Sequence, residues 1–243
     1  MKYFIWIIIF SFACLVQASA QETDTPKTIR VLIIDDHGPG YYHMPTGTLL
    51  RDMLNGFEQV EAVLFEDAEV LGTDLVFDYD VLLLHFKNYR PLQRDEQAKR
   101  NIVKYVNEGG GLFVFHFACG AFEYWPEYEQ YVGRIWDPQK PPHDPYGAFT
   151  VHAVDRSHPI MEGISDFVTS DELYTCLKDS NVSIQVLAEA VSKVDGKAHP
   201  MIFTLEKGKG RVFHTTLGHD AKSLSSESFQ KIIRQSLHWL AEK

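Results

Sequence analysis

The chain has 243 residues and a formal net charge of −10, with 23 Lys and Arg against 33 Asp and Glu. This length fits one large domain. The strong acidity argues against a nucleic-acid-binding surface, because such a surface would repel phosphate. The three cysteines are too few to form a disulfide framework in a domain of this size.

The first twenty residues have the composition of a secretory signal peptide. Lys2 provides a positive start, residues 4–13 are almost wholly apolar, and Ala18-Ser19-Ala20 is the pattern that signal peptidase cuts. The apolar stretch is too short for a convincing membrane span. We therefore predict that residues 1–20 are removed and that the protein is exported to the periplasm or the extracellular space.

Two alternatives remain for this segment, an uncleaved anchor and a lipid anchor at Cys14. A lipid anchor is less favoured than simple secretion, because residues 11–13 match a lipoprotein signal poorly, and an uncleaved anchor is the least favoured of the three. Residues 21–28 are polar and are predicted to be a disordered leader. A single domain is expected from residue 29 to residue 243.

The first half of this domain alternates between buried strands and helices. Continuous apolar runs are typical of strands buried on both faces, and Gly109 to Gly111 is suited to ending a helix. The predicted strands are 29–34, 61–65, 79–85 and 112–115, and the predicted helices are 46–55 and 95–108. The alternation predicts an α/β three-layer sandwich with a mostly parallel central sheet and helices on both faces.

The second half is less regular. Residues 123–166 hold many prolines and aromatic residues and are predicted to be an insertion over the sheet edge, with a β-like run at 148–154. Further predicted elements are a strand at 183–188, a hairpin of 200–205 and 211–217, and an amphipathic helix at 229–241.

Polar residues follow several of these strands. In parallel sheets, ligands bind beyond the carboxyl ends of the strands. Imidazoles and carboxylates that meet there would suit a metal ion or an acid–base pair. The four candidate places are Asp36-His37 with His43, His116 to Cys119, Ser170 to Tyr174, and Leu217 to Asp220.

Each candidate also has a structural explanation. A histidine at a strand end is often satisfied by a backbone carbonyl, and Asp171-Glu172 could begin a helix, where acidic residues are favoured. Trp125 and Tyr128 could be packing residues rather than a sugar platform. Four other histidines lack context and are expected to be structural or exposed: His143, His152, His199 and His238.

The chain resembles the ThuA-like (trehalose utilisation) family, whose fold is related to class I glutamine amidotransferases. The resemblance implies that the α/β sandwich is of the flavodoxin and class I glutamine amidotransferase type. The resemblance runs from about residue 29 to residue 241. It rests on YYHMPTG at 41–47, YDVLLL at 79–84, YVNEGGGLFVFHFACGAFEYWPEYEQYVG at 105–133, SHPIMEGI at 157–164, DELY at 171–174 and GKGRVFHTTLGHD at 208–220. The chain departs from the family pattern at Arg134-Ile135-Trp136 and at Cys119.

The resemblance implies a carbohydrate-active enzyme of disaccharide or glycoside breakdown. Its substrate would be a 3-keto-sugar supplied by a partner sugar dehydrogenase, and the reaction a metal-assisted proton abstraction leading to elimination, hydration or isomerisation. A divalent metal, zinc for example, would be bound by His43, His116 and His219, with His37 in reserve. Expected catalytic residues are Glu172, Asp220 and Asp36, and expected substrate-binding residues are Trp125, Tyr128 and Asp171.

Two other functions remain open. One is a thiol hydrolase in which Cys119 pairs with His219, although Cys119 comes later than the nucleophile of such enzymes normally does. The other is a non-catalytic sugar-binding protein. The sequence leaves open the oligomeric state, a homo-oligomer included, and a bridge between Cys119 and Cys176.

Overall fold

The computed structural model describes residues 27–36, 46–88 and 90–242, so the predicted signal peptide and most of the predicted leader lie outside the described residues. The strands are β1 (Ile29–Ile34), β2 (Val60–Phe65), β3 (Val81–Leu84), β4 (Gly111–Phe115), β5 (Gly147–Ala153), β6 (Phe167–Asp171), β7 (Gln185–Val191), β8 (Ala198–Lys207) and β9 (Gly210–Thr215). The α-helices are α1 (Thr46–Asn55), α2 (Asp95–Asn107), α3 (Glu129–Val132), α4 (Ala221–Leu224) and α5 (Glu227–Ala241). The 3₁₀ helices are η1 (Ala68–Gly72), η2 (Asp74–Asp78), η3 (His116–Gly120), η4 (Pro126–Tyr128) and η5 (Pro159–Met161).

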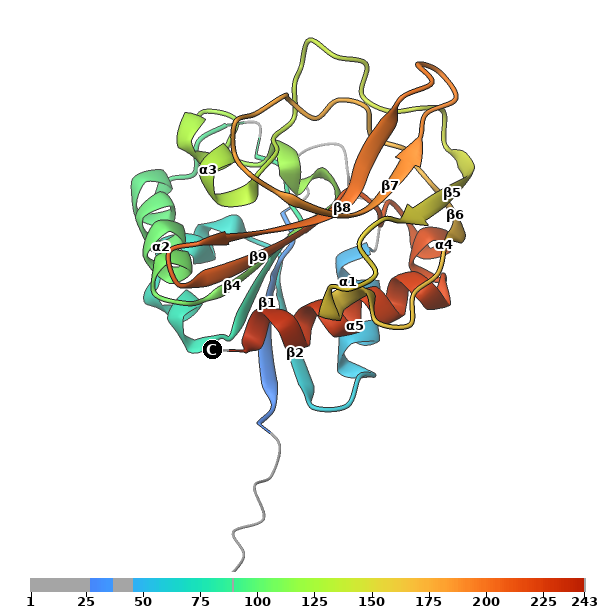
Figure 1. The fold of residues 1–243 in the computed structure, drawn as a ribbon. Coiled ribbons are helices and arrows are strands. Elements are labelled where there is room, and N and C mark those ends of the chain that lie inside the picture. The colour runs from blue at the N-terminus through green and yellow to red at the C-terminus, as the bar shows by residue number, and fades with distance from the viewer. Residues whose placement is uncertain (1–26, 37–45, 89, 243) are drawn as a thin grey trace, which may run out of the picture.

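All these strands form one sheet in the order β2-β1-β3-β4-β9-β8-β7-β5-β6. The five strands from β2 to β9 are mutually parallel, and we call them the parallel half. From β9 onward each neighbour is antiparallel, so β8, β7, β5 and β6 form an antiparallel half (Figure 1). The α/β fold class is confirmed, and the strands predicted in the parallel half match within two residues.

Helices cover both faces of the parallel half, as Figure 1 shows for α2 and for α1 with α5. Alternate residues of β1 point to opposite faces, as the period of two in a strand requires. Val31 and Ile33 belong to the core that contains residues of α1 and α5. Leu32 and Ile34 belong to the core that contains residues of α2. Burial on both faces explains why this strand reads as a continuous apolar run.

The antiparallel half differs more from its prediction. The hairpin is confirmed as β8 and β9, and the strand expected at 183–188 is β7, which runs to Val191. The sequence interpretation did not include β6. The alternative that Asp171 and Glu172 begin a helix is wrong, because β6 ends at Asp171 and pairs with β5. An edge pairing of this kind depends on a distant partner strand rather than on a local pattern.

The segment before β5 runs antiparallel to the segment after β6. Isolated bridges join Trp136 to Leu177 and His143 to Tyr174. The Asp144 amide also donates a hydrogen bond of 2.9 Å to the Leu173 carbonyl. These pairings hold part of the predicted insertion beside the end of β6.

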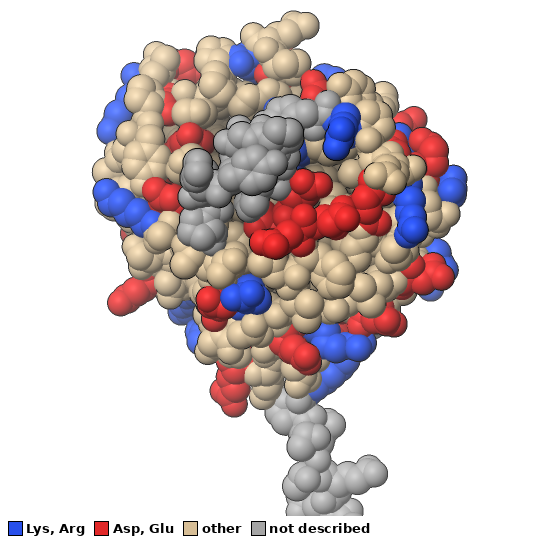
Figure 2. All heavy atoms as spheres, turned by 180° about the vertical axis from the view of Figure 1, so that it is seen from behind, with Lys and Arg blue, Asp and Glu red and all other residues tan. Residues whose placement is uncertain are grey.

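Acidic side chains gather on the face shown in Figure 2. Within the described part of the chain, no helix is both long and apolar enough to span a membrane.

Candidate active site

Three imidazoles surround the carboxylate of Glu172. Its Oε2 lies 3.3 Å from Nδ1 of His219 and 3.7 Å from Nε2 of His116. Its Oε1 lies 3.4 Å from Nε2 of His143. The four residues come from four separate segments, and of the predicted site residues the structure brings together His116, Glu172 and His219.

His116 directly follows β4 and has a φ of +51°. A non-glycine residue in this region is strained by roughly 1–3 kcal/mol, and such strain persists only where the surroundings hold the residue. Here Nδ1 lies 2.8 Å from the Thr216 carbonyl oxygen, to which it donates. Nε2 therefore carries the lone pair, and burial lowers the pKa of His116 to about 3, so the ring is neutral.

Asp171 holds the loop that carries His219. Its carboxylate accepts hydrogen bonds from the amides of Gly218 at 2.7 Å, His219 at 3.3 Å and Glu172 at 2.8 Å. The side chain is fully buried, and this burial raises its pKa to about 6. Asp171 thus orients Glu172 and His219 and has no exposed surface with which to contact a substrate.

Glu172 and His219 favour each other's charged forms. The hydrogen bond from Glu172 raises the pKa of His219, with burial opposing the shift. Burial would raise the pKa of Glu172, but the hydrogen bond with His219 and the charges of the neighbouring histidines hold it below its ordinary value. Glu172 is therefore ionised at neutral pH.

His143 is the member of the site that the sequence interpretation missed. Its Nδ1 lies 2.7 Å from the Asp144 carbonyl oxygen, so Nδ1–H donates and the lone pair of Nε2 faces Glu172. The bridge to Tyr174 brings it there. No periodic pattern surrounds His143 in a proline-rich stretch, so only its pairing with the chain after β6 could have revealed it.

Tyr174, the last residue of the DELY motif, packs behind His116. Its hydroxyl lies 3.3 Å from His116 Nε2, and its ring centroid lies 5.0 Å from that of His116. The side chain is buried, and burial raises its pKa, so the hydroxyl keeps its proton and can donate to Nε2.

These residues line a cavity of about 150 Å³. Its described lining is Thr46, His85, Lys87, His116, Phe117, Trp136, His143, Glu172, Tyr174 and His219. His85, the last residue of the strand predicted at 79–85, was not among the predicted site residues. Its Nδ1 lies 2.9 Å from a carboxylate oxygen of the buried Asp35.

The cluster of His116, Glu172 and His219 could hold a metal ion, because one ligand atom from each lies within 4.8 Å of the others. The donor chemistry fits as well. The Glu172 carboxylate is ionised, and Nε2 of His116 lies 3.7 Å from its Oε2, where the Tyr174 hydroxyl can also donate to this nitrogen. The Thr216 carbonyl that accepts from His116 Nδ1–H is the usual kind of support for a histidine ligand.

Several predicted site residues lie elsewhere. Asp220 caps α4 through the amides of Lys222 and Ser223 and accepts a hydrogen bond of 2.8 Å from the Tyr146 hydroxyl. Asp36 follows β1 and does not line the cavity described above. His37 and His43 lie outside the described residues.

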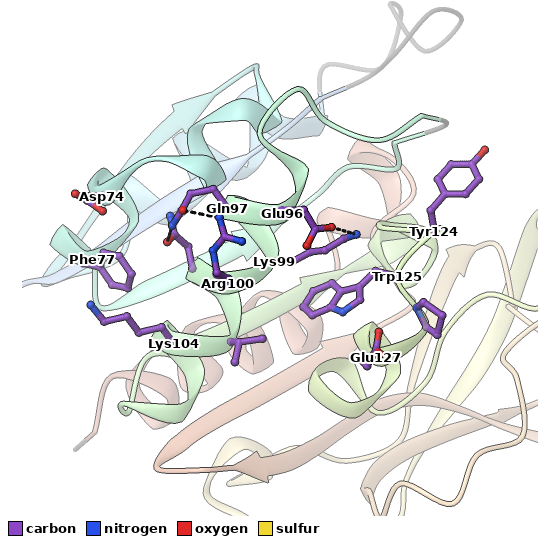
Figure 3. Close-up of a pocket in the computed structure, with 13 residues that line it drawn as sticks. Asp74, Phe77, Glu96, Gln97, Lys99, Arg100, Lys104, Tyr124, Trp125 and Glu127 are labelled. Atoms are coloured by element: carbon purple, nitrogen blue, oxygen red, sulfur yellow. Dashed lines mark hydrogen bonds and ion pairs between the residues drawn. The ribbon is translucent and has the colours of Figure 1, made fainter.

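Trp125 and Tyr128 are buried in the core on the α2 face and do not line the Glu172 cavity. Trp125 stacks on Tyr131 with ring centroids 5.8 Å apart. It also borders a groove of about 740 Å³ beside α2, shown in Figure 3. The polar side chains of this groove bind one another, as in the contact of 3.1 Å between Lys99 and Glu96.

Cys119 is not paired with His219. It is fully buried beside Cys176 and Tyr174, with the partly buried Trp136 packed against them, and burial raises its pKa well above the ordinary value. Cys119 and Cys176 are free thiols in the structure. A thiol that is neither ionised nor beside an imidazole base is poorly suited to nucleophilic catalysis.

The sequence model of the ThuA family, described as trehalose utilisation, matches residues 30–240. The chain belongs to the ThuA family. This membership places the protein in carbohydrate metabolism. A search of curated proteins finds no matching relative.

Solved structures show the same fold. A ThuA-like protein from Parabacteroides merdae is 21% identical with a TM-score of 0.77, over 88% of this chain and 90% of the other. A ThuA-like protein from Bacteroides uniformis is 16% identical with a TM-score of 0.70, over 88% and 91%. A glutamine amidotransferase from Thermotoga maritima is 12% identical with a TM-score of 0.56, over 89% and 99%. At these identities the likeness concerns the fold alone.

Proposed function

We propose that this protein is an exported enzyme of disaccharide breakdown that removes the proton next to the ketone of a 3-keto-sugar. The observation that carries the proposal is the Glu172 carboxylate set among the imidazoles of His116, His143 and His219. Membership of the ThuA family supports a sugar as substrate. A sugar dehydrogenase of the same pathway would introduce the ketone, which acidifies the proton on the neighbouring carbon.

The proton acceptor in this proposal is His143. Donation from Nδ1–H to the Asp144 carbonyl fixes the tautomer and leaves Nε2 able to take a proton. The imidazolium that forms would be stabilised by Oε1 of Glu172 at 3.4 Å. Glu172 itself is a weaker candidate base than the sequence suggested, because its lowered pKa makes it hold a proton poorly.

His116, Glu172 and His219 would hold a divalent cation, for which zinc suits the nitrogen and oxygen donors. Such a cation, when bound, would act as a Lewis acid on the ketone oxygen. His116 is held for this role by Thr216, and His219 by the bonds that Asp171 makes to its loop.

The test combines elemental analysis of the purified protein with assays on 3-keto-disaccharides. Glu172→Gln and His116→Ala should each lower kcat/KM by at least about 100-fold. Glu206→Gln, on an exposed position of β8, is the matched control and should retain activity. Full activity in both site variants would contradict the proposal. Sugar binding without turnover by the unaltered protein would instead favour the sugar-binding alternative.

A further inference from the structure

The Glu172 cavity is smaller than the usual ligand site, and its walls differ in exposure. Its volume of about 150 Å³ compares with roughly 300–1,000 Å³ for typical small-molecule pockets. The side chain of His116 is 3% exposed, whereas those of His143 and His219 are 28% and 26% exposed. A ligand larger than the cavity would therefore extend outward past His143 and His219.

Tyr146 lies on this exposed side of the cavity. It directly precedes β5 and follows His143 by three residues. Its ring centroid lies 5.6 Å from that of His219, and the two ring planes are tilted by 54°. Tyr146 is 41% exposed, unlike the aromatic residues that pack in the two main cores. Its ring is therefore accessible to a ligand that lies beside His219.

The hydroxyl group of Tyr146 fixes the position of this ring. The hydroxyl lies 2.8 Å from Oδ2 of Asp220 and 3.3 Å from the Ser170 carbonyl oxygen. Burial and the hydrogen bond with Asp220 raise the pKa of Tyr146 to about 12, so the hydroxyl keeps its proton and donates it. Asp220 is itself held by the amides of Lys222 and Ser223. The ring is thus ordered before a ligand binds, which lowers the entropy cost of binding.

An ordered aromatic ring at the edge of this cavity suits a sugar. The ring has an apolar face, and the C–H groups on one face of a sugar ring can pack against it. Because the hydroxyl is used on Asp220, Tyr146 would offer ring contact rather than a hydrogen bond to the ligand. Trp125 and Tyr128 were predicted to bind the sugar in this way, but both are buried in the core.

We propose that Tyr146 is a substrate-binding residue of this site, whose ring packs against the apolar face of the sugar that carries the ketone. The inference rests on the proposed function for the identity of that sugar. It also assigns Asp220 as a positioning residue, which orients Tyr146 through its hydroxyl. In the competing, purely structural role, the bond from Tyr146 to Asp220 would only hold the loop that carries His219.

The experiment measures KM and kcat on 3-ketotrehalose, and the Kd of this sugar by calorimetry in a His143→Gln background that lacks the proposed base. Tyr146→Ala should raise KM and Kd at least about tenfold and change kcat less than about threefold. Tyr146→Phe keeps the ring and loses the hydroxyl, so KM and Kd should rise less than about threefold. In the structural role, both variants would lower kcat alike.

Tyr124→Ala is the matched control for the loss of an exposed tyrosine. Tyr124 is 57% exposed and borders the α2 groove of Figure 3 instead of the Glu172 cavity. This variant should leave KM, Kd and kcat unchanged. Because Tyr146 is also exposed, its truncation should leave the fold intact, as circular dichroism would check.

The outcomes separate this inference from the proposed function. Binding that Tyr146→Ala weakens and Tyr146→Phe preserves, in a protein without turnover, would support the role of Tyr146 and reject the enzyme. Turnover with KM and Kd unchanged in Tyr146→Ala, or with kcat lowered alike in both variants, would overturn the role of Tyr146 and leave the enzyme standing. Neither binding nor turnover of 3-ketotrehalose by the unaltered protein would overturn both proposals.

Discussion

The parallel and antiparallel halves of the sheet contribute to the same site in different ways. The parallel half supplies His116 after β4 and His219 after β9, two strands that pair directly. The antiparallel half supplies Glu172 after β6, and the segment bridged to it supplies His143. Two imidazoles thus sit at adjacent ends of parallel strands, whereas the carboxylate and the third imidazole reach them through a distant edge strand and two isolated bridges.

This difference separates site residues that are positioned by core packing from site residues that are positioned by a few polar contacts. The parallel strand ends are buried on both faces and held by the core, so the positions of His116 and His219 depend on packing. Glu172 and His143 depend on a few polar contacts. Substitutions near the site in the parallel half should therefore lower mainly the free energy of unfolding. Substitutions near the site in the antiparallel half should lower mainly the catalytic rate.

The largest effect is expected from His143→Gln, which removes the proposed proton acceptor from the antiparallel side. We expect kcat on the 3-keto-disaccharide to fall by about 10²–10⁴-fold, the usual contribution of a general base. Stability should change little, because His143 is only partly buried. His199→Ala, whose ring pairs with Asp195, is the control for losing a histidine from the same half. A kcat equal to that of the unaltered protein would rule out His143 as the base.

A second prediction concerns Gly218, which carries His219 from the parallel half. Gly218 has a φ of +115°, and a β-carbon there would lie 2.1 Å from Cζ of Phe115. Gly218→Ala should lower the free energy of unfolding by about 3 kcal/mol, from backbone strain and overpacking together. Gly196 also has a positive φ, at +72°, but a β-carbon there would meet no atom within 4 Å. Gly196→Ala should therefore lower the free energy of unfolding by only about 1 kcal/mol. Urea unfolding measures both, and equal losses would show that the contact with Phe115 is unimportant.

The third prediction tests the link between the halves through Asp171. Asp171→Asn replaces one of the two acceptor oxygens of the carboxylate with an amide nitrogen. The backbone amide of Gly218 or of His219 then loses its hydrogen-bond acceptor, which should lower the free energy of unfolding by about 2 kcal/mol. Because the pKa of Asp171 is raised from 3.8 to about 6, the folded protein binds more protons, and its stability falls as pH rises between these values. That fall should be absent in Asp171→Asn. Urea unfolding from pH 4 to 7 checks this, and the same fall in the variant would refute it.

The smallest effect is expected from the contact between Glu172 and His219. The raised pKa of His219 means that its stabilising contribution is complete below about pH 6.5 and is lost as pH rises through the folded-state value. The lowered pKa of Glu172 means that its contribution is present above about pH 4.5 and is lost as pH falls through the folded-state value. Glu172→Gln should return the pKa of His219 toward its ordinary value, as NMR titration of the metal-free protein would measure. Glu206→Gln should leave that titration unchanged.

Sequence patterns predicted the parallel half well because each of its strands is a local signal. A strand buried on both faces must be apolar along its length. A polar residue soon after the apolar run then marks the end of the strand, as Asp36 does for β1 and His116 does for β4. The edge strand β6 has no continuous apolar run that could predict it. Val168 is an exposed apolar residue, and Asp171 is a charged residue that is buried because its carboxylate accepts hydrogen bonds. His143 had no local signal at all, because its place depends on a pairing with Tyr174 across 31 residues of chain.

The sequence by itself determined the family, the alternation of elements and the strand ends that carry His116 and His219, because local apolar runs and glycine turns encode them. Only the tertiary structure decided that Glu172 stands among three imidazoles, that Asp171 acts on the backbone of this site, and that Trp125 and Tyr128 pack in the core. These arrangements come from pairing between distant segments, where hydrogen bonds and burial select the partner, and no local pattern records that choice.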